Sequence, residues 1–178
     1  MLQETEPNLM LPELTDGEIV LRPFTVADVP AHLAGDDAEQ AKWLGGKSTE
    51  ESARSWIQTN QEHWKTGEPI YNFAIRNAED QLVGWVEANV DHEGLGLSEG
   101  DANISYAVYP HARGKGYVGK AITLLESFLA EKGIKRSVIR VSPENTASLA
   151  VPMRLGYDDK GDGVSKDGDL LRTFTKQL

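Results

Sequence analysis

The sequence lacks cysteine, long apolar runs and any excess of basic residues. Without cysteine the chain cannot form disulfides, thiolate metal sites or a cysteine nucleophile. No stretch approaches the roughly 20 apolar residues that a membrane-spanning helix needs, and residues 1–11 lack the basic and apolar regions of a signal peptide. These absences predict a cytoplasmic protein that does not insert into a membrane.

The balance of charge narrows the class of ligand. The chain has 18 Lys and Arg residues against 28 Asp and Glu, a net charge of −10, and so acidic a protein repels the phosphates of nucleic acid. We therefore expect no nucleic-acid partner. An acidic protein attracts a cationic, amine-bearing substrate, although acidic surfaces also serve solubility alone. The four histidines show no metal-ligand spacing, so no metal is expected. We assign them to the surface or to loops: His32, His63, His92 and His111.

The chain is expected to fold as one domain, residues 17–178, behind a loosely ordered leader, residues 1–16. The leader is polar and shows no apolar period. Helical spacing predicts helices from Thr25, from a Ser48-x-x-Glu51 capping box and from Val118. Alternating apolar residues and turn signals predict strands at 18–24, 71–76, 82–90, 104–108, 137–141 and twice within 157–176. The Gly-rich, acidic stretch 91–100 is expected to form a loop. This order predicts an α/β fold with a mixed, mostly antiparallel sheet and helices on both faces.

The turn between the strand at 104–108 and the helix from Val118 carries the strongest functional signal. Pro110 ends the strand, and the turn then reads Arg113, Gly114, Lys115, Gly116, Tyr117, Val118 and Gly119. Glycines let the backbone approach a ligand closely, and free N–H groups at a helix start attract anions. Two cations, Arg113 and Lys115, stand beside them. The pattern predicts a phosphate-binding turn.

Two other interpretations of this turn remain. The pattern Gly114-x-Gly116-x-x-Gly119 matches the dinucleotide fingerprint, but in that fingerprint the first glycine follows the strand directly, and an acidic residue about 20 residues later holds the ribose. Here residues 109–113 intervene, and the strand at 137–141 ends without an acid. The cations favour a more heavily phosphorylated ligand. A purely structural turn is the remaining alternative.

A second segment, residues 145–157, makes the functional signal of the turn at residues 113–119 more specific. It reads Asn-Thr-Ala-Ser-Leu-Ala-Val-Pro-Met-Arg-Leu-Gly-Tyr, in which Asn145 is a good helix N-cap and Gly156 a good helix stop. The order is strand, Arg-x-x-Gly-x-x-Gly helix, strand, Asn-x-x-Ser helix and Leu-Gly-aromatic. From Glu18 onward the chain therefore resembles the GNAT superfamily of acetyl-CoA-dependent N-acetyltransferases, and within it the ribosomal-protein-alanine acetyltransferase branch (RimJ/RimL type).

The resemblance implies where acetyl-CoA, the cosubstrate, would bind. The backbone of residues 113–119 would hold the pyrophosphate. The strand edge at Val108 would pair with the pantetheine arm, and Asn145 would hydrogen-bond that arm. Relatives usually carry Gly or Ala where Val118 stands, and the larger side chain also fits the apolar face of the helix.

The catalytic residues are less clearly marked. Amine acylation needs a base for the amine, and Glu87 is the first candidate because its strand should neighbour that of Tyr106. A solvated strand carboxylate is the alternative. By the resemblance, many relatives carry a glutamate where Asn103 stands, and others carry a thiolate-protonating tyrosine where Pro152 stands. Because proline cannot donate a proton, Ser148 becomes the nearest hydroxyl for the leaving thiolate, unless it serves only in the capping turn.

Together these features predict an N-acetyltransferase that moves an acetyl group from acetyl-CoA to a primary amine by direct attack in a ternary complex. The sequence does not identify the acceptor, since a protein N-terminus, a small amine and an amine antibiotic all qualify. The rival interpretation is a non-catalytic acyl-CoA-binding module, because the usual glutamate and tyrosine are missing. A homodimer remains one option for the assembly.

Overall fold

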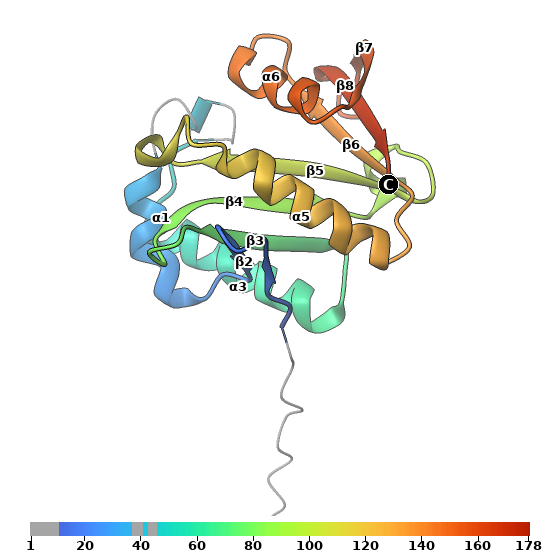
Figure 1. Ribbon diagram of the computed structural model, residues 1–178. Helices are drawn as coiled ribbons and strands as arrows, with labels where there is room; N and C mark the ends of the chain where they lie inside the picture. Colours follow the sequence, from blue (N-terminus) through green and yellow to red (C-terminus); the bar gives the residue numbers. More distant parts are fainter. Residues whose placement is uncertain (1–10, 37–40, 43–45) are drawn as a thin grey trace, which may run out of the picture.

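An eight-stranded sheet forms the centre of the computed structural model, which describes residues 11–36, 41–42 and 46–178 (Figure 1). Its strands lie in the order β1-β2-β3-β4-β5-β6-β8-β7. Every neighbouring pair is antiparallel except β5 and β6, which are parallel. The strands are β1 (Leu14–Thr15), β2 (Val20–Arg22), β3 (Ile70–Arg76), β4 (Leu82–Asn89), β5 (Asp101–Val108), β6 (Arg136–Val141), β7 (Asp158–Val164) and β8 (Leu170–Gln177).

The sheet begins inside the segment that the sequence assigns to a leader. In β1, Leu14 pairs with Leu21 of β2, and the hydroxyl of Thr15 donates a hydrogen bond to the carbonyl of Ile19 at 2.7 Å. Residues 1–10 of the leader lie outside the described residues. The short strand β1 thus forms one edge of the sheet.

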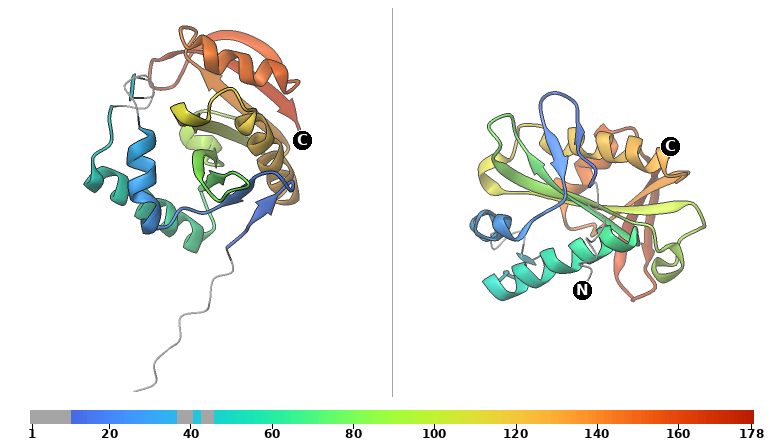
Figure 2. Two further views of the ribbon diagram at one scale, coloured as in Figure 1. Left: turned by 60° about the vertical axis from the view of Figure 1, so that its left-hand side comes forward. Right: turned by 90° about the horizontal axis from the view of Figure 1, so that it is seen from below.

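Helices cover both faces of the sheet, as the sequence predicts. Figure 2 shows the sheet between α3 and α5. The predicted mixed, mostly antiparallel α/β fold is confirmed. The helices are η1 (Val26–Asp28), α1 (Val29–Gly35), α3 (Glu50–Thr66), α4 (His92–Leu95), η2 (Pro110–Ala112), α5 (Tyr117–Glu131) and α6 (Thr146–Arg154).

Each face of the sheet has its own apolar core because successive strand side chains point to opposite sides. On β4, Val86 belongs to the core that contains Leu125 of α5. The adjacent Trp85 belongs to the other core, with Ile57 of α3. By the same alternation Glu87 lies on the α3 face, beside Trp85 and opposite the face that packs on α5.

The strands β5 and β6 pair at one end and diverge at the other. Residues 101–103 pair with residues 136–138. Arg136 fastens this end through two hydrogen bonds to Asp101, Nε to Oδ1 at 2.7 Å and Nη2 to Oδ2 at 2.6 Å. Beyond it β5 continues to Val108, whereas β6 turns away toward α6 and β8 (Figure 1). This divergence makes room at the carboxyl ends of both strands.

Two local features differ from the sequence prediction. The N-cap of α3 is Thr49 rather than Ser48: Thr49 Oγ1 accepts from the Ser52 amide at 3.1 Å, and Ser52 Oγ accepts from the Thr49 amide at 2.8 Å. The expected loop before β5 contains the short helix α4, because Asp91 Oδ1 accepts from the Gly94 amide at 3.0 Å and caps it. In both cases a short polar side chain closes a turn that apolar spacing does not mark.

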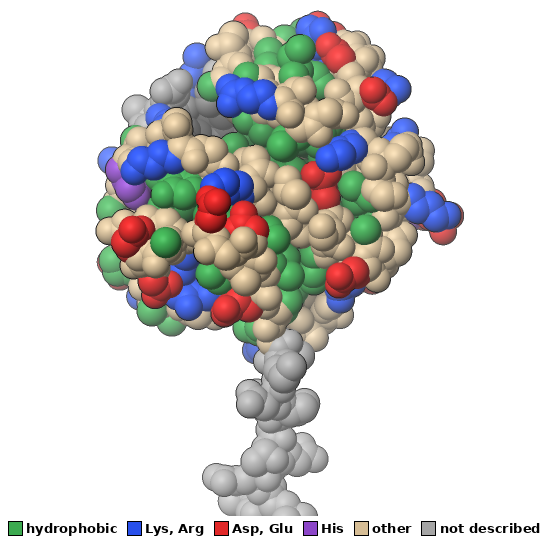
Figure 3. All heavy atoms as spheres, in the orientation of Figure 1, with side chains coloured by type: hydrophobic (Ala, Val, Ile, Leu, Met, Phe, Trp, Pro, Cys, Tyr) green, Lys and Arg blue, Asp and Glu red, His purple; other side chains and the backbone are tan. Residues whose placement is uncertain are grey.

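Charged side chains of both signs are interspersed over the face seen in Figure 3. Within the described ranges, the helices are too short or too polar to cross a membrane. The same ranges hold no group of three or more His, Asp or Glu side chains that could ligate a metal ion.

Candidate active site

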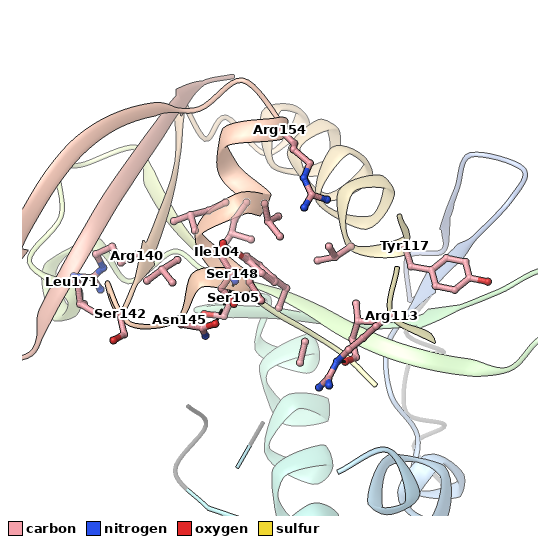
Figure 4. Close-up of a pocket in the computed structure, with 18 of the residues that line it drawn as sticks. Ile104, Ser105, Arg113, Tyr117, Arg140, Ser142, Asn145, Ser148, Arg154 and Leu171 are labelled. Carbon is pink, nitrogen blue, oxygen red and sulfur yellow. Dashed lines mark hydrogen bonds between the residues drawn. The ribbon is translucent and has the colours of Figure 1, made fainter. Parts of the chain in front are cut away.

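A cavity of about 890 Å³ opens where β5 and β6 diverge. Figure 4 shows Ser105, Asn145 and Ser148 gathered at its centre, with Arg113 on one side of them and Arg140 on the other. The cavity therefore joins the turn before α5 to the first turn of α6, two segments that the sequence singles out separately.

Most of the residues predicted to bind CoA line this cavity. Lys115 and Gly119 lie in the same turn but outside the lining, and a Cβ on Gly119 would only touch Leu155 at 3.6 Å. The predicted residues in the lining are Val108, Arg113, Gly114, Gly116, Tyr117, Val118, Asn145 and Ser148.

The backbone at the start of α5 is open to an anionic ligand. Gly114 and Gly116 have φ of +75° and +76°, values that L side chains rarely adopt. A Cβ on Gly116 would meet no atom within 4 Å, so the conformation, not the space, demands glycine there. Gly116 is the N-cap of α5, and N–H groups of a first helical turn lack intrahelical partners. Their partial positive charge suits a phosphate.

Arg113 brings a full positive charge to this turn. Its Nε donates to the carbonyl of Val108 at the end of β5, at 3.3 Å. Arg154, in the last turn of α6, also lines the cavity, and Figure 4 shows its side chain pointing from α6 toward α5. The two guanidinium groups make this end of the cavity electropositive within an acidic protein.

Asn145 caps α6 and still has an amide donor to offer. Its Oδ1 accepts from the Ser148 amide at 3.3 Å, which is the predicted capping role. Among the described residues its Nδ2 has no hydrogen-bond partner, and the side chain lines the cavity. The amide N–H groups are therefore available to a ligand.

Pro152 lies inside α6 and cannot supply the N–H that a helix normally gives to the carbonyl of Ser148. Tyr106 of β5 replaces it, because its hydroxyl donates to that carbonyl at 2.9 Å. Burial raises the pKa of Tyr106, so the hydroxyl stays protonated and remains a donor near neutral pH. This bond ties α6 to β5 at the cavity wall.

Glu87 lies one side chain away from the cavity. It pairs in register with Asn72 of β3 and with Ser105 of β5, and Ser105 does line the cavity. Side chains at directly opposed antiparallel positions have Cβ atoms about 5 Å apart. The carboxylate of Glu87 therefore lies within reach of a group bound beside Ser105, directly or through one water.

The environment of Glu87 suits a base. Burial raises its pKa above the usual glutamate value, against the opposing effects of Asn72 and His63. The Asn72 effect is a hydrogen bond, Nδ2 to Oε2 at 2.9 Å, which favours the ionised form. A carboxylate with a raised pKa takes up a proton more readily near neutral pH.

His32 is buried, which corrects its assignment to the surface or to a loop. Its side chain is 9% exposed, its Nδ1 lies 2.6 Å from the Tyr109 hydroxyl oxygen, and its ring stacks on Trp56. Burial lowers its pKa, against opposing effects of Asp36 and Asp28. This cluster joins α1 to Tyr109, the residue that follows β5 and precedes η2 and the turn predicted to bind phosphate.

The cavity residues that sequence interpretation misses include Ser105, Arg140 and Arg154. The alternation of β5 and β6 indicates which face Ser105 and Arg140 take, but no signal shows that these strands diverge. For Arg154 the available signal is a cation directly before the Leu155-Gly156 helix stop.

Comparison with known proteins defines the class of this protein. The family model of the acetyltransferase (GNAT) domain matches residues 18–158. The chain therefore belongs to the GNAT acetyltransferase family, and the predicted family is confirmed. The predicted enzyme class, an acetyltransferase with acetyl-CoA as cosubstrate, is confirmed with it. No curated protein matches the sequence.

Solved structures of the same fold include RimJ- and RimL-type enzymes. The RimL ribosomal L7/L12 α-N-protein acetyltransferase is 20% identical, with a TM-score of 0.78 over 95% of this chain and 96% of that chain. The Microcin C7 self-immunity acetyltransferase MccE, in complex with acetyl-CoA and AMP, is 20% identical, with a TM-score of 0.77 over 92% and 94%. Mycobacterium smegmatis RimJ, in complex with CoA-disulfide, is 21% identical, with a TM-score of 0.75 over 94% and 87%. At these identities the likeness establishes the fold.

Proposed function

We propose that this protein transfers the acetyl group of acetyl-CoA to a primary amine by direct attack within a ternary complex. The observation that carries the proposal is the single cavity that reaches from Arg113 to Ser105, the cross-strand neighbour of Glu87. A cationic turn for the phosphates and a half-buried carboxylate for the amine thus lie along one path. Residues 17–178 would form the acetyltransferase domain, with β1 added at its edge, and would act in the cytoplasm.

The anionic part of acetyl-CoA is assigned to the turn at residues 113–119. Exposed N–H groups at the start of α5 and the guanidinium of Arg113 support this assignment. Arg154 adds a second cation. The edge of β5 at Val108 would receive the pantetheine arm, and the amide of Asn145 would donate to it. This order places the thioester near Ser105 and Ser148, at the centre of the cavity.

Glu87 is assigned as the base. A primary amine arrives protonated, and its proton would pass to Glu87, directly or through a water beside Ser105. The amine nitrogen then bonds to the acetyl carbonyl carbon to give a tetrahedral intermediate. As the carbon–sulfur bond breaks, the nitrogen loses its second proton, which passes through solvent to the departing thiolate and gives CoA as the free thiol. The hydroxyl of Ser148 would donate a hydrogen bond to the departing thiolate, since Pro152 has no proton to give.

Direct transfer is favoured over an acyl-enzyme. The chain has no cysteine, the most capable protein nucleophile for a thioester. In the part of the chain that the structure describes, no histidine hydrogen-bonds to Ser148, which therefore lacks an activating base. Ser148 is better placed as a donor to sulfur than as a nucleophile.

Initial-rate kinetics test this proposal. Free-thiol release should require an amine, and a panel of peptide N-termini and small amines should give intersecting double-reciprocal lines. Parallel lines, together with an acetyl-serine detected by mass spectrometry, would contradict direct transfer. Tight acetyl-CoA binding without thiol release for any amine would instead favour a non-catalytic acyl-CoA-binding module.

A further inference from the structure

A second cavity of about 390 Å³ adjoins the first at Arg140 and Leu171, which lie on the side of the first cavity away from Arg113 (Figure 4). It lies between the α4 segment and the β7–β8 hairpin, and it shares Arg140 and Leu171 with the first cavity. The remaining lining includes Leu95, Thr173 and the hairpin residue Lys166. A ligand could therefore extend from one cavity into the other past the guanidinium of Arg140.

Arg140 is held in position but is not neutralised. Its Nε donates to Asn103 Oδ1 at 3.2 Å, and its Nη1 donates to the carbonyl of Leu95 at 3.3 Å. Both partners are uncharged. Across the described ranges no carboxylate forms an ion pair with Arg140, and its Nη2 has no hydrogen-bond partner. The guanidinium of Arg140 is thus held in one orientation, and its Nη2 donors remain available to a ligand.

Other partly buried arginines of this protein behave differently. Arg76 is ion-paired to Asp28, and Arg136 is ion-paired to Asp101. In so acidic a chain an unpaired, half-buried guanidinium is the exception, and it costs desolvation without a compensating charge. A ligand carboxylate would supply that charge through a charge-assisted, bidentate pair.

The lining of the second cavity adds positive charge beside Arg140, whereas the first cavity, which Arg140 also lines, has one acidic residue in its described lining, Asp169. Lys166 lines the second cavity, and no carboxylate pairs with it among the described residues. None of the described residues that line this cavity is acidic. The CoA phosphates are assigned to the opposite end, around Arg113, so Arg140 is left for the acceptor.

The sheet gives the spacing between the residue that holds Arg140 and the residue that faces Glu87. Asn103, which holds Arg140, and Ser105, which faces Glu87, are two residues apart on β5 and share one face. At about 3.4 Å per residue they are about 7 Å apart. An extended peptide spans about 3.5 Å per residue, so a carboxylate on the first or second residue of a peptide would reach Arg140.

We propose that the second cavity is an acceptor subsite for a carboxylate, held by Arg140 and Lys166. This inference rests on the proposed function and names its substrate class: a peptide amine with a carboxylate one or two residues from the nitrogen. The carboxylate is either the C-terminus of a dipeptide or an acidic side chain near a protein N-terminus.

Matched acceptor pairs test the proposal and separate the two sources. Ser-Ala against Ser-Ala amide isolates a C-terminal carboxylate, and Ser-Asp-Ala amide against Ser-Asn-Ala amide isolates a side-chain carboxylate. For at least one pair the acid should have a kcat/KM about 10- to 100-fold higher than its partner, in line with a charge-assisted hydrogen bond. Arg140→Gln should bring that ratio close to one, and Lys166→Gln should lower it. The control Lys160→Gln, on exposed β7 outside both linings, should keep it.

Equal kcat/KM within both pairs for the unaltered enzyme would overturn the subsite while leaving the transferase function standing. If no member of either pair is acetylated, calorimetry with CoA present decides instead. Tighter binding of the acid, lost in Arg140→Gln, would support the subsite even though the transferase proposal had failed for these amines. Equal affinities of acid and amide would overturn it.

Discussion

The two ends of the main cavity are built in different ways. The proposed CoA end centres on one turn, residues 113–116, and its main feature is a backbone with glycines at positive φ. The proposed amine end is assembled from side chains on separate strands: Asn72 on β3, Glu87 on β4, Ser105 on β5 and Arg140 on β6. A site made of N–H groups tolerates loss of one side chain, whereas a site made of one carboxylate does not. We therefore expect substitutions at the first end to weaken binding and substitutions at the second to reduce turnover.

The largest effect is expected for Glu87→Gln. The amide cannot accept the proton of the amine, so kcat should fall about 10- to 1,000-fold, in line with general-base contributions. The dissociation constant of acetyl-CoA should stay the same, because Glu87 lies outside the CoA end. Steady-state thiol release measures the first quantity. Glu79→Gln, in the exposed β3–β4 turn, is the matched control, and an unaltered kcat in Glu87→Gln would exclude the glutamate as base.

At the other end, Arg113→Glu should weaken acetyl-CoA binding about 10- to 100-fold, because it replaces a charge-assisted contact with repulsion. Its control is Arg54→Glu on α3, which makes the same change of charge at an exposed position outside the cavity lining. Calorimetric titration checks both variants. Equal loss of affinity in both would indicate a general effect of net charge rather than a local contact.

Asn145→Asp separates capping from ligand binding. Aspartate also caps helices, so the melting temperature should hold. The amide donor is lost, and the KM for acetyl-CoA should rise about fivefold, the value of roughly one hydrogen bond. A variant that melts early with a normal KM would leave Asn145 with the capping role alone.

Asn72→Leu should change the pH dependence of the reaction. The Asn72 hydrogen bond favours ionised Glu87 and holds its pKa down against burial. Its removal raises that pKa further, so the acidic limb of the kcat/KM profile should move to higher pH, with the rate lost first at low pH. A midpoint that does not move would mean that Glu87 does not control this limb.

The smallest effect concerns the bond between Tyr106 and the carbonyl of Ser148. Tyr106→Phe should cost about 1 kcal/mol of unfolding free energy, or about 2–4 °C in Tm for a chain of this size. With Pro152→Ala the helix regains an N–H for that carbonyl, so the same Tyr106→Phe change should cost less. A double-mutant cycle of thermal melts measures the difference. Identical costs in both backgrounds would show that Tyr106 does not substitute for the missing N–H.

The contrast between the two ends also explains what the sequence can predict. The fold class and the turn at residues 113–119 follow from local patterns, because apolar alternation, helical spacing and glycines are properties of neighbouring residues. The N-cap role of Asn145 follows in the same way, and the structure confirms it.

The features of the site that the sequence does not predict depend on contacts between distant segments. The tie from Tyr106 to Ser148 spans 42 residues, and His32 is buried because its partner Tyr109 lies 77 residues away. Arg140 follows ordinary strand alternation, and it becomes a site residue only because β6 leaves β5 after three paired positions. The choice of Thr49 over Ser48 as N-cap was beyond prediction for a different reason, since both residues can cap a helix.

The central claim is that the two ends have separate tasks, and one calorimetric experiment tests it most directly. Acetyl-CoA is titrated into the unaltered protein, Arg113→Glu and Glu87→Gln under the same conditions. The account predicts that Arg113→Glu loses about 10- to 100-fold in affinity, while Glu87→Gln binds as the unaltered protein does. Normal binding by Arg113→Glu together with weakened binding by Glu87→Gln would contradict it.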